Sequence, residues 1–118
     1  IKMVKDQFGS PTSTELVVFI LKKILYKIKQ NKFKSGVFNL CPKQNTNRYD
    51  LTKYIFNKYF NKKFLKNLEI ESICTKNLKL VAQRPLNSRM KTDKIKRFLK
   101  VETKNWKFYL NNYLKKLK

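Results

Sequence analysis

The pattern of apolar and polar residues predicts helices separated by short strands. It is clearest in residues 13–30, where apolar side chains recur at helical spacing and lysines occupy the opposite face. The apolar stripe consists of Val17, Ile20, Leu21, Ile24, Leu25 and Ile28. A helix lying on a membrane surface has the same pattern, but a helix that packs on a core is commoner, so we expect the latter.

The same criteria predict the rest of the chain. Helices are expected over residues 48–60, from Thr92 or Asp93 onward, and over residues 104–117. Asn47 suits the N-cap of the helix over residues 48–60. Residues 1–4, 36–40 and 69–74 have the composition or alternation of short strands. The order of elements predicts a mixed α/β fold, and no linker indicates a second domain.

The stretch KDQFGSPTST, residues 5–14, holds one of the two glycines and one of the three prolines of the chain. Gly9 permits backbone angles that other residues avoid, and Pro11 favours an extended Ser10. Thr12 and Glu15 have the Thr-x-x-Glu spacing of a capping box. The stretch is therefore expected to connect a strand to the N-terminus of a helix.

The charge of the chain is strongly positive. The 29 Lys and Arg residues against 7 acidic ones give a net charge of +22, and the only arginines are Arg48, Arg84, Arg89 and Arg97. A polyanion partner such as nucleic acid is one interpretation. The excess of scattered Lys over Arg favours another, in which an A/T-rich genome supplies lysine at solvated positions, because nucleic-acid readers rely on Arg. An apolar content of 42% is enough for a buried core.

Several kinds of site are excluded by composition. The chain has no His, so a Ser/His/Asp set and a His-containing zinc site cannot form. Two glycines are too few for a glycine-rich phosphate loop. Cys41 and Cys74 are expected to be a buried pair of free thiols in a reducing cytoplasm, with a disulfide as the alternative. No apolar run approaches the roughly 20 residues needed to cross a bilayer.

Two patterns with catalytic spacing are interpreted as surface features. Glu69 and Glu71 share one face of a predicted strand and are expected to be a solvated pair beside Lys. The spacing Tyr-x-x-x-Lys occurs on a lysine-rich helix, where it arises by chance, at Tyr49/Lys53, Tyr54/Lys58 and Tyr59/Lys63.

Two segments together resemble a known family. KDQFGSPTSTELV (5–17) and QRPLNSRMKTDKI (83–95) are similar to the carboxyl-terminal part of dTDP-4-dehydrorhamnose reductases, which belong to the extended short-chain dehydrogenase/reductase superfamily. The segments GVFNL, NRYDLTKYIF and NWKFYLNNYL also resemble that family, in the same order. Departures from its pattern are Arg48, where the family has Trp, and Lys91, where it has Asp.

The resemblance implies an NADPH-dependent reduction of dTDP-4-dehydro-L-rhamnose to dTDP-L-rhamnose for cell-surface polysaccharide. In the family, the glycine motif and the catalytic Thr and Tyr-x-x-x-Lys precede this region, in the Rossmann half. Residues 1–118 are therefore expected to be a single partial domain that binds the dTDP-sugar, with no catalytic, cofactor-binding or metal-binding residue. The implied partner is the Rossmann half, the implied location is the cytoplasm, and a homodimer stays open.

The resemblance also suggests site residues. Arg84 is expected to bind the diphosphate, since a guanidinium forms bidentate contacts with phosphate oxygens. Asp6 and Gln7 are expected either to contact substrate or to hold a neighbouring loop, and Phe8 either to pack beside the sugar or base or to lie in the core. Asn87 and Ser88 add donors, unless they only satisfy backbone groups.

Two other functions remain open. The departures at Arg48 and Lys91 leave room for a reductase-like protein that binds or regulates without catalysis. The charge alone would fit a small nucleic-acid-binding module, which gives no reason for the DQFGSPT and RPLNS segments. An upstream Tyr-x-x-x-Lys and glycine motif would favour the enzyme.

Overall fold

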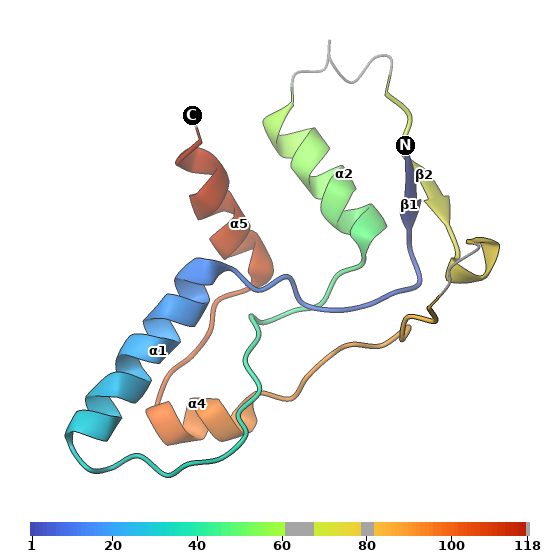
Figure 1. The fold of residues 1–118 in the computed structure, drawn as a ribbon. Coiled ribbons are helices and arrows are strands. Elements are labelled where there is room, and N and C mark those ends of the chain that lie inside the picture. Colours follow the sequence, from blue (N-terminus) through green and yellow to red (C-terminus); the bar gives the residue numbers. More distant parts are fainter. Residues whose placement is uncertain (61–67, 79–81, 118) are drawn as a thin grey trace. The chain divides into compact units, whose positions relative to one another are not determined.

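The computed structural model describes residues 1–60, 68–78 and 82–117. Its elements in chain order are β1 (Lys2–Val4), α1 (Thr14–Lys29), α2 (Arg48–Tyr59), β2 (Glu71–Ile73), the short 3-10 helix η1 (Thr75–Asn77), α4 (Asp93–Leu99) and α5 (Trp106–Lys115) (Figure 1). The predicted α/β class is confirmed. The chain forms two compact units: unit 1 consists of Ile1–Gly9 and Asn45–Arg89, and unit 2 of Ser10–Gln44 and Met90–Lys118.

Unit 1 contains a two-stranded parallel sheet. β1 pairs with β2 in the register Lys2–Glu71, Met3–Ser72 and Val4–Ile73. Val4 is buried, and the Lys5 N–H continues the pairing by donating to the Ile73 carbonyl at 3.0 Å. Because the strands are parallel, the loops that follow them leave the same edge of the sheet. This is the edge at which parallel sheets commonly carry ligand sites.

Helix α2 belongs to the same unit and contacts β1. Asn47 is its N-cap, as predicted: the Asn47 Oδ1 accepts the Asp50 N–H at 2.8 Å, and Nδ2 donates to the Asp50 carboxylate at 2.8 Å. The cap satisfies an N–H that the first turn of a helix would otherwise leave without a partner. The helix ends at Tyr59, close to the predicted boundary.

Gly9 does not adopt the positive φ angle that a glycine permits. Its N–H donates to the Thr46 carbonyl at 3.0 Å, and the Thr46 N–H donates back at 2.9 Å, so Gly9 is a bridge residue between two chain segments. Positive φ angles occur among the described residues at Asn31, Gly36, Gln44 and Lys100, and not at Gly9.

Unit 2 packs α1, α4 and α5 around one apolar core. Its buried members are Leu16, Ile20, Ile95, Leu99 and Tyr109. Leu16 and Ile20 lie one helical turn apart and therefore face the core together. The Tyr109 hydroxyl accepts the Lys104 N–H at 3.2 Å, which satisfies its polar end. The predicted helices at Asp93 and in residues 104–117 are confirmed, the latter over a shorter range.

The N-cap of α1 corrects a sequence prediction. Ser13 is the cap, and its Oγ accepts the Leu16 N–H at 3.2 Å. The hydroxyl of Thr12 instead donates to the Ser10 carbonyl at 3.1 Å. The predicted Thr12–Glu15 capping box is therefore wrong. Thr12 and Ser13 are both suitable N-cap residues by type, but the Thr12 hydroxyl is engaged with the Ser10 carbonyl.

The strand predicted over residues 36–40 is absent. In the part of the chain that the structure describes, no strand pairs with this segment. Phe38 instead packs against Phe33 and Phe98, with ring centroids 6.3 and 5.3 Å away. The Val37 carbonyl accepts the Lys94 Nζ at 2.9 Å. A strand needs a neighbour for its backbone groups, and hydrophobic packing fixes this segment without one.

Candidate functional site

The two segments singled out by sequence meet at Phe8, within unit 1. The Phe8 N–H donates to the Leu86 carbonyl at 2.8 Å, and the Ser88 N–H donates to the Phe8 carbonyl at 2.8 Å. Phe8 and Asn87 thereby form an isolated parallel bridge. The structure thus brings Phe8, Asn87 and Ser88 together through backbone pairing.

Asp6 and Gln7 converge on Thr75, the first residue of η1. The Asp6 carboxylate accepts the Thr75 N–H at 3.0 and 2.9 Å and the Thr75 hydroxyl at 2.7 Å. Gln7 Nε2 donates to the same hydroxyl oxygen at 3.1 Å. These bonds connect the loop after β1 to the loop after β2. Of the two roles considered for Asp6 and Gln7, the contacts match the one in which they hold a neighbouring loop.

The ionised form of Asp6 is favoured by these contacts. Its pKa lies below the ordinary value, first because the Thr75 hydroxyl donates to the carboxylate and second because the Thr75 N–H does so. Hydrogen bonds to a carboxylate stabilise its charged form relative to the protonated one.

The ring of Phe8 is accessible to solvent. It is 40% exposed, so it is not a core residue. The Arg89 guanidinium carbon lies 6.0 Å from the ring centroid. Asn87 Oδ1 accepts both the Arg89 N–H at 3.1 Å and the Arg89 Nε at 2.8 Å. Asn87 therefore positions Arg89 beside the ring.

Arg84 lines a hollow of about 340 Å³ in unit 1. The other described residues of its lining are Thr75, Lys76, Leu78 and Gln83. Asp6 and Gln7 are connected to this hollow through Thr75, the residue they bind. Phe8, Asn87 and Ser88 are not among the lining residues.

Sequence reasoning missed Thr75, Lys76 and Arg89. Thr75 and Lys76 belong to a stretch without clear periodicity, and only their position just after a predicted strand could have marked them. Arg89 directly follows RPLNS, so the motif itself could have included it.

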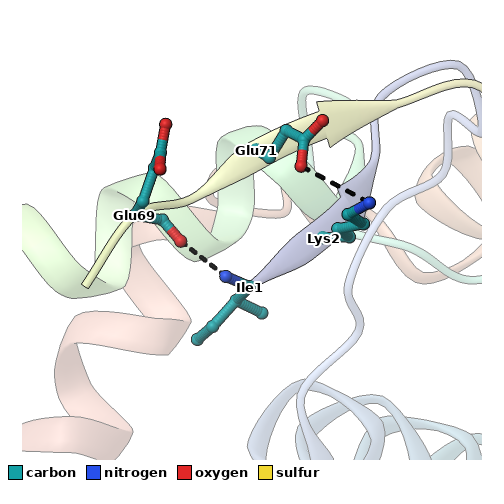
Figure 2. A network of polar contacts seen from close by, with 4 residues as sticks. All are labelled: Ile1, Lys2, Glu69 and Glu71. Atoms are coloured by element: carbon teal, nitrogen blue, oxygen red, sulfur yellow. Dashed lines mark hydrogen bonds and ion pairs between the residues drawn. The ribbon is translucent and has the colours of Figure 1, made fainter.

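The acidic pair and the Tyr54/Lys58 pair are surface features. Figure 2 shows Lys2 reaching Glu71, with 3.7 Å between Nζ and Oε2, while the Glu69 backbone carbonyl accepts from the Ile1 amino group. Lys58 Nζ donates to the Tyr54 hydroxyl at 3.1 Å on the exposed side of α2, and this bond raises the pKa of Lys58. Lys63 lies outside the described residues. A lysine held in its charged form on a helix surface gives no sign of a base.

The described ranges contain no further feature typical of a metal-binding or membrane-spanning protein. Cys41 is buried, Cys74 is half-buried, and both are free thiols. Within residues 1–60, 68–78 and 82–117, no three His, Cys, Asp or Glu side chains gather in a way that could hold a metal ion. In the same ranges, no helix combines the length and apolar character needed to cross a membrane.

The site thus has the character of a ligand-binding region: donors and an exposed ring at the carboxyl edge of a small parallel sheet. Comparison with protein families identifies it further. The model of the RmlD substrate binding domain matches residues 1–118, so the chain belongs to this family.

Two curated relatives share the name dTDP-4-dehydrorhamnose reductase. The protein of Aggregatibacter actinomycetemcomitans is 28% identical over 112 residues, which cover 93% of this chain and 38% of the relative. That of Sinorhizobium fredii is 25% identical over 108 residues, covering 90% of this chain and 36% of the relative. The chain thus spans little more than a third of the length of these relatives.

Two solved structures share the fold. A dTDP-4-dehydrorhamnose reductase of Bacillus anthracis, crystallised in complex with NADP, is 19% identical and gives a TM-score of 0.72 over 98% of this chain and 38% of its own. A dTDP-4-dehydrorhamnose reductase of Clostridium acetobutylicum is 24% identical and gives a TM-score of 0.76. The match covers 99% of this chain and 38% of that protein.

Proposed function

We propose that this chain is the substrate-binding part of a cytoplasmic, NADPH-dependent dTDP-4-dehydrorhamnose reductase. The reaction would reduce dTDP-4-dehydro-L-rhamnose to dTDP-L-rhamnose for cell-surface polysaccharide. The observation that carries the proposal is the backbone pairing of Phe8 with Leu86 and Ser88, which joins the two motif segments in a chain of this family. The names of the two relatives support the choice of substrate.

Each predicted binding residue has a role in this proposal. Arg84 binds the diphosphate, supported by its place in the 340 Å³ hollow. Phe8 offers an exposed ring to the sugar or the base. Asn87 and Ser88 shape the segment beside it, and Asp6 and Gln7 hold the loop that starts at Thr75.

NADPH does not fit the residues of this chain. Gly9 and Gly36 are its only glycines, too few for a dinucleotide-binding loop. The proposal therefore assigns NADPH binding and catalysis to a nucleotide-binding half outside these 118 residues, which agrees with the greater length of the two relatives. By itself, the 118-residue chain should oxidise no NADPH when mixed with dTDP-4-dehydro-L-rhamnose.

The surface of unit 2 supports a partner of that kind. Part of the apolar stripe of helix α1 that was predicted to pack on a core is instead exposed, with Leu21 51%, Leu25 63% and Ile28 47% accessible. Val37, in the segment that was predicted to be a strand, is 83% accessible. Exposed apolar side chains are typical of interaction surfaces where they form a contiguous patch.

Calorimetric titration of the chain with dTDP-L-rhamnose tests the proposed function. The wild type should bind, and Arg84→Gln should weaken binding by about tenfold or more, since a charged hydrogen-bond partner contributes about 1.5–3 kcal/mol. Arg97→Gln, on α4 of unit 2, is the control with the same charge change and should bind as the wild type does. Absence of binding by the wild type would overturn the proposed function.

A further inference from the structure

The hollow beside Arg84 contains a second cation. Lys76 and Arg84 both contribute to its lining, together with Thr75, Leu78 and Gln83. The ion pairs found among the described residues are Lys2–Glu71 and Lys43–Glu102, so neither cation of the hollow is neutralised by an acid there. Two cations therefore line the hollow without an ion pair among the described residues, and the acid bound to its lining residue Thr75 is Asp6.

Few side chains among the described lining residues are available as donors. Thr75 directs both its N–H and its hydroxyl at Asp6, and its hydroxyl oxygen accepts from Gln7, so its polar groups are engaged. The side chains of Lys76, Gln83 and Arg84 remain as donors. A ligand that fits these donors is rich in acceptors and negatively charged.

The backbone that carries Lys76 is fixed. Asp6 holds Thr75, the residue before Lys76, by three hydrogen bonds. The 3-10 helix η1 adds bonds from the Asn77 N–H to the Cys74 carbonyl and from the Leu78 N–H to the Thr75 carbonyl, both 3.0 Å. A cation on an anchored loop loses less freedom on binding than one on a mobile loop.

We propose that Lys76 is a second phosphate-binding residue, which acts with Arg84 on the diphosphate of the sugar nucleotide. The inference rests on the proposed function and names a residue that the sequence motifs do not contain. A diphosphate diester carries one negative charge on each phosphate, so two cations match it where Arg84 alone would not. The volume of about 340 Å³ lies at the lower end of the range for ligand pockets.

The test compares Lys76→Gln with Lys22→Gln, a control that lowers the net charge equally at an exposed position of α1. The probes are dTDP, inorganic pyrophosphate and thymidine, titrated at fixed ionic strength of about 0.15 M, which screens the general field of the chain. Lys76→Gln should weaken dTDP and pyrophosphate binding by about tenfold and leave any thymidine binding unchanged. Lys22→Gln should bind like the wild type, and Lys76→Arg should retain most of the affinity.

The outcomes separate this inference from the proposed function. If the wild type binds dTDP and Lys76→Gln matches Lys22→Gln, the role of Lys76 is overturned and the proposed function stands. If the wild type binds neither dTDP nor dTDP-L-rhamnose, both are overturned. If Lys76→Arg retains the affinity for dTDP and Lys76→Gln loses it, the effect is due to charge. Both variants change the same exposed side chain, and only Lys76→Gln removes its charge.

Discussion

Asp6 is the ionisable residue of the site whose charge the structure stabilises by direct hydrogen bonds. Its pKa is lowered by the Thr75 hydroxyl and, next, by the Thr75 N–H. A carboxyl with a lowered pKa in the folded state contributes stability that is complete above its unfolded pKa. That contribution is lost as the pH falls through the lowered value.

Asp6→Asn should therefore destabilise the chain at neutral pH and matter progressively less as the pH falls below the ordinary carboxyl range. The reason is that the protonated wild type loses the same charged interaction that the variant lacks. Urea unfolding of both proteins at a series of pH values measures the difference in the free energy of unfolding. Thr75→Val should reduce the same pH dependence, and Thr75→Ser should preserve it. A difference between wild type and Asp6→Asn that is constant with pH would contradict this account.

At the scale of elements, α1 shows how local and tertiary effects combine. Leu16 and Ile20 are buried in unit 2, whereas Leu21 and Leu25 of the predicted apolar stripe are exposed. Its N-terminus depends on the single hydroxyl of Ser13. Packing along one face therefore positions the helix, and a local hydrogen bond determines where it begins.

Ser13→Ala should destabilise the chain by about 1 kcal/mol, because the Leu16 N–H loses its acceptor at the N-cap. Thr12→Ala is the matched control, since the Thr12 hydroxyl donates to the Ser10 carbonyl at an exposed position and caps no helix. Chemical denaturation of both variants measures the two changes in the free energy of unfolding. If Thr12→Ala lowered the free energy of unfolding more than Ser13→Ala does, Thr12 would be the N-cap, as the sequence spacing predicts.

At the scale of the whole molecule, two surface properties oppose each other. The net charge of +22 makes copies of the chain repel one another. The exposed apolar side chains of α1, Leu21 and Leu25 among them, favour association. The balance should depend on salt, because screening acts on the charges and leaves the apolar attraction.

Self-association of the chain should therefore increase with salt concentration. Replacing Leu21 and Leu25 together by Lys should abolish that increase and leave the fold intact, since both side chains are more than half exposed. Sedimentation velocity at low and high salt measures the first effect, and circular dichroism checks the second. If the double variant associated as strongly as the wild type, α1 would not form the contact between copies of the chain.

The sequence by itself determined the features that depend on neighbours along the chain. The helices, the Asn47 cap and the strands β1 and β2 follow from periodicity and residue type over a few positions. Motif spacing was enough to indicate the family, which the family model over residues 1–118 confirms. The predicted ligand contacts, Arg84 among them, stay predictions that ligand binding can test. The single partial domain also stays a prediction.

Only the tertiary structure decided which distant groups meet. Thr75 and Lys76 entered the site because β1 and β2 pair in parallel and Asp6 reaches across to the second loop. Residues 36–40 have the composition of a strand but no partner strand in the described chain, so packing of Phe38 determines their place. The physical reason is the same in each case. Periodicity reports which side of an element is apolar, whereas a hydrogen bond between loops or strands requires a partner that the fold must supply.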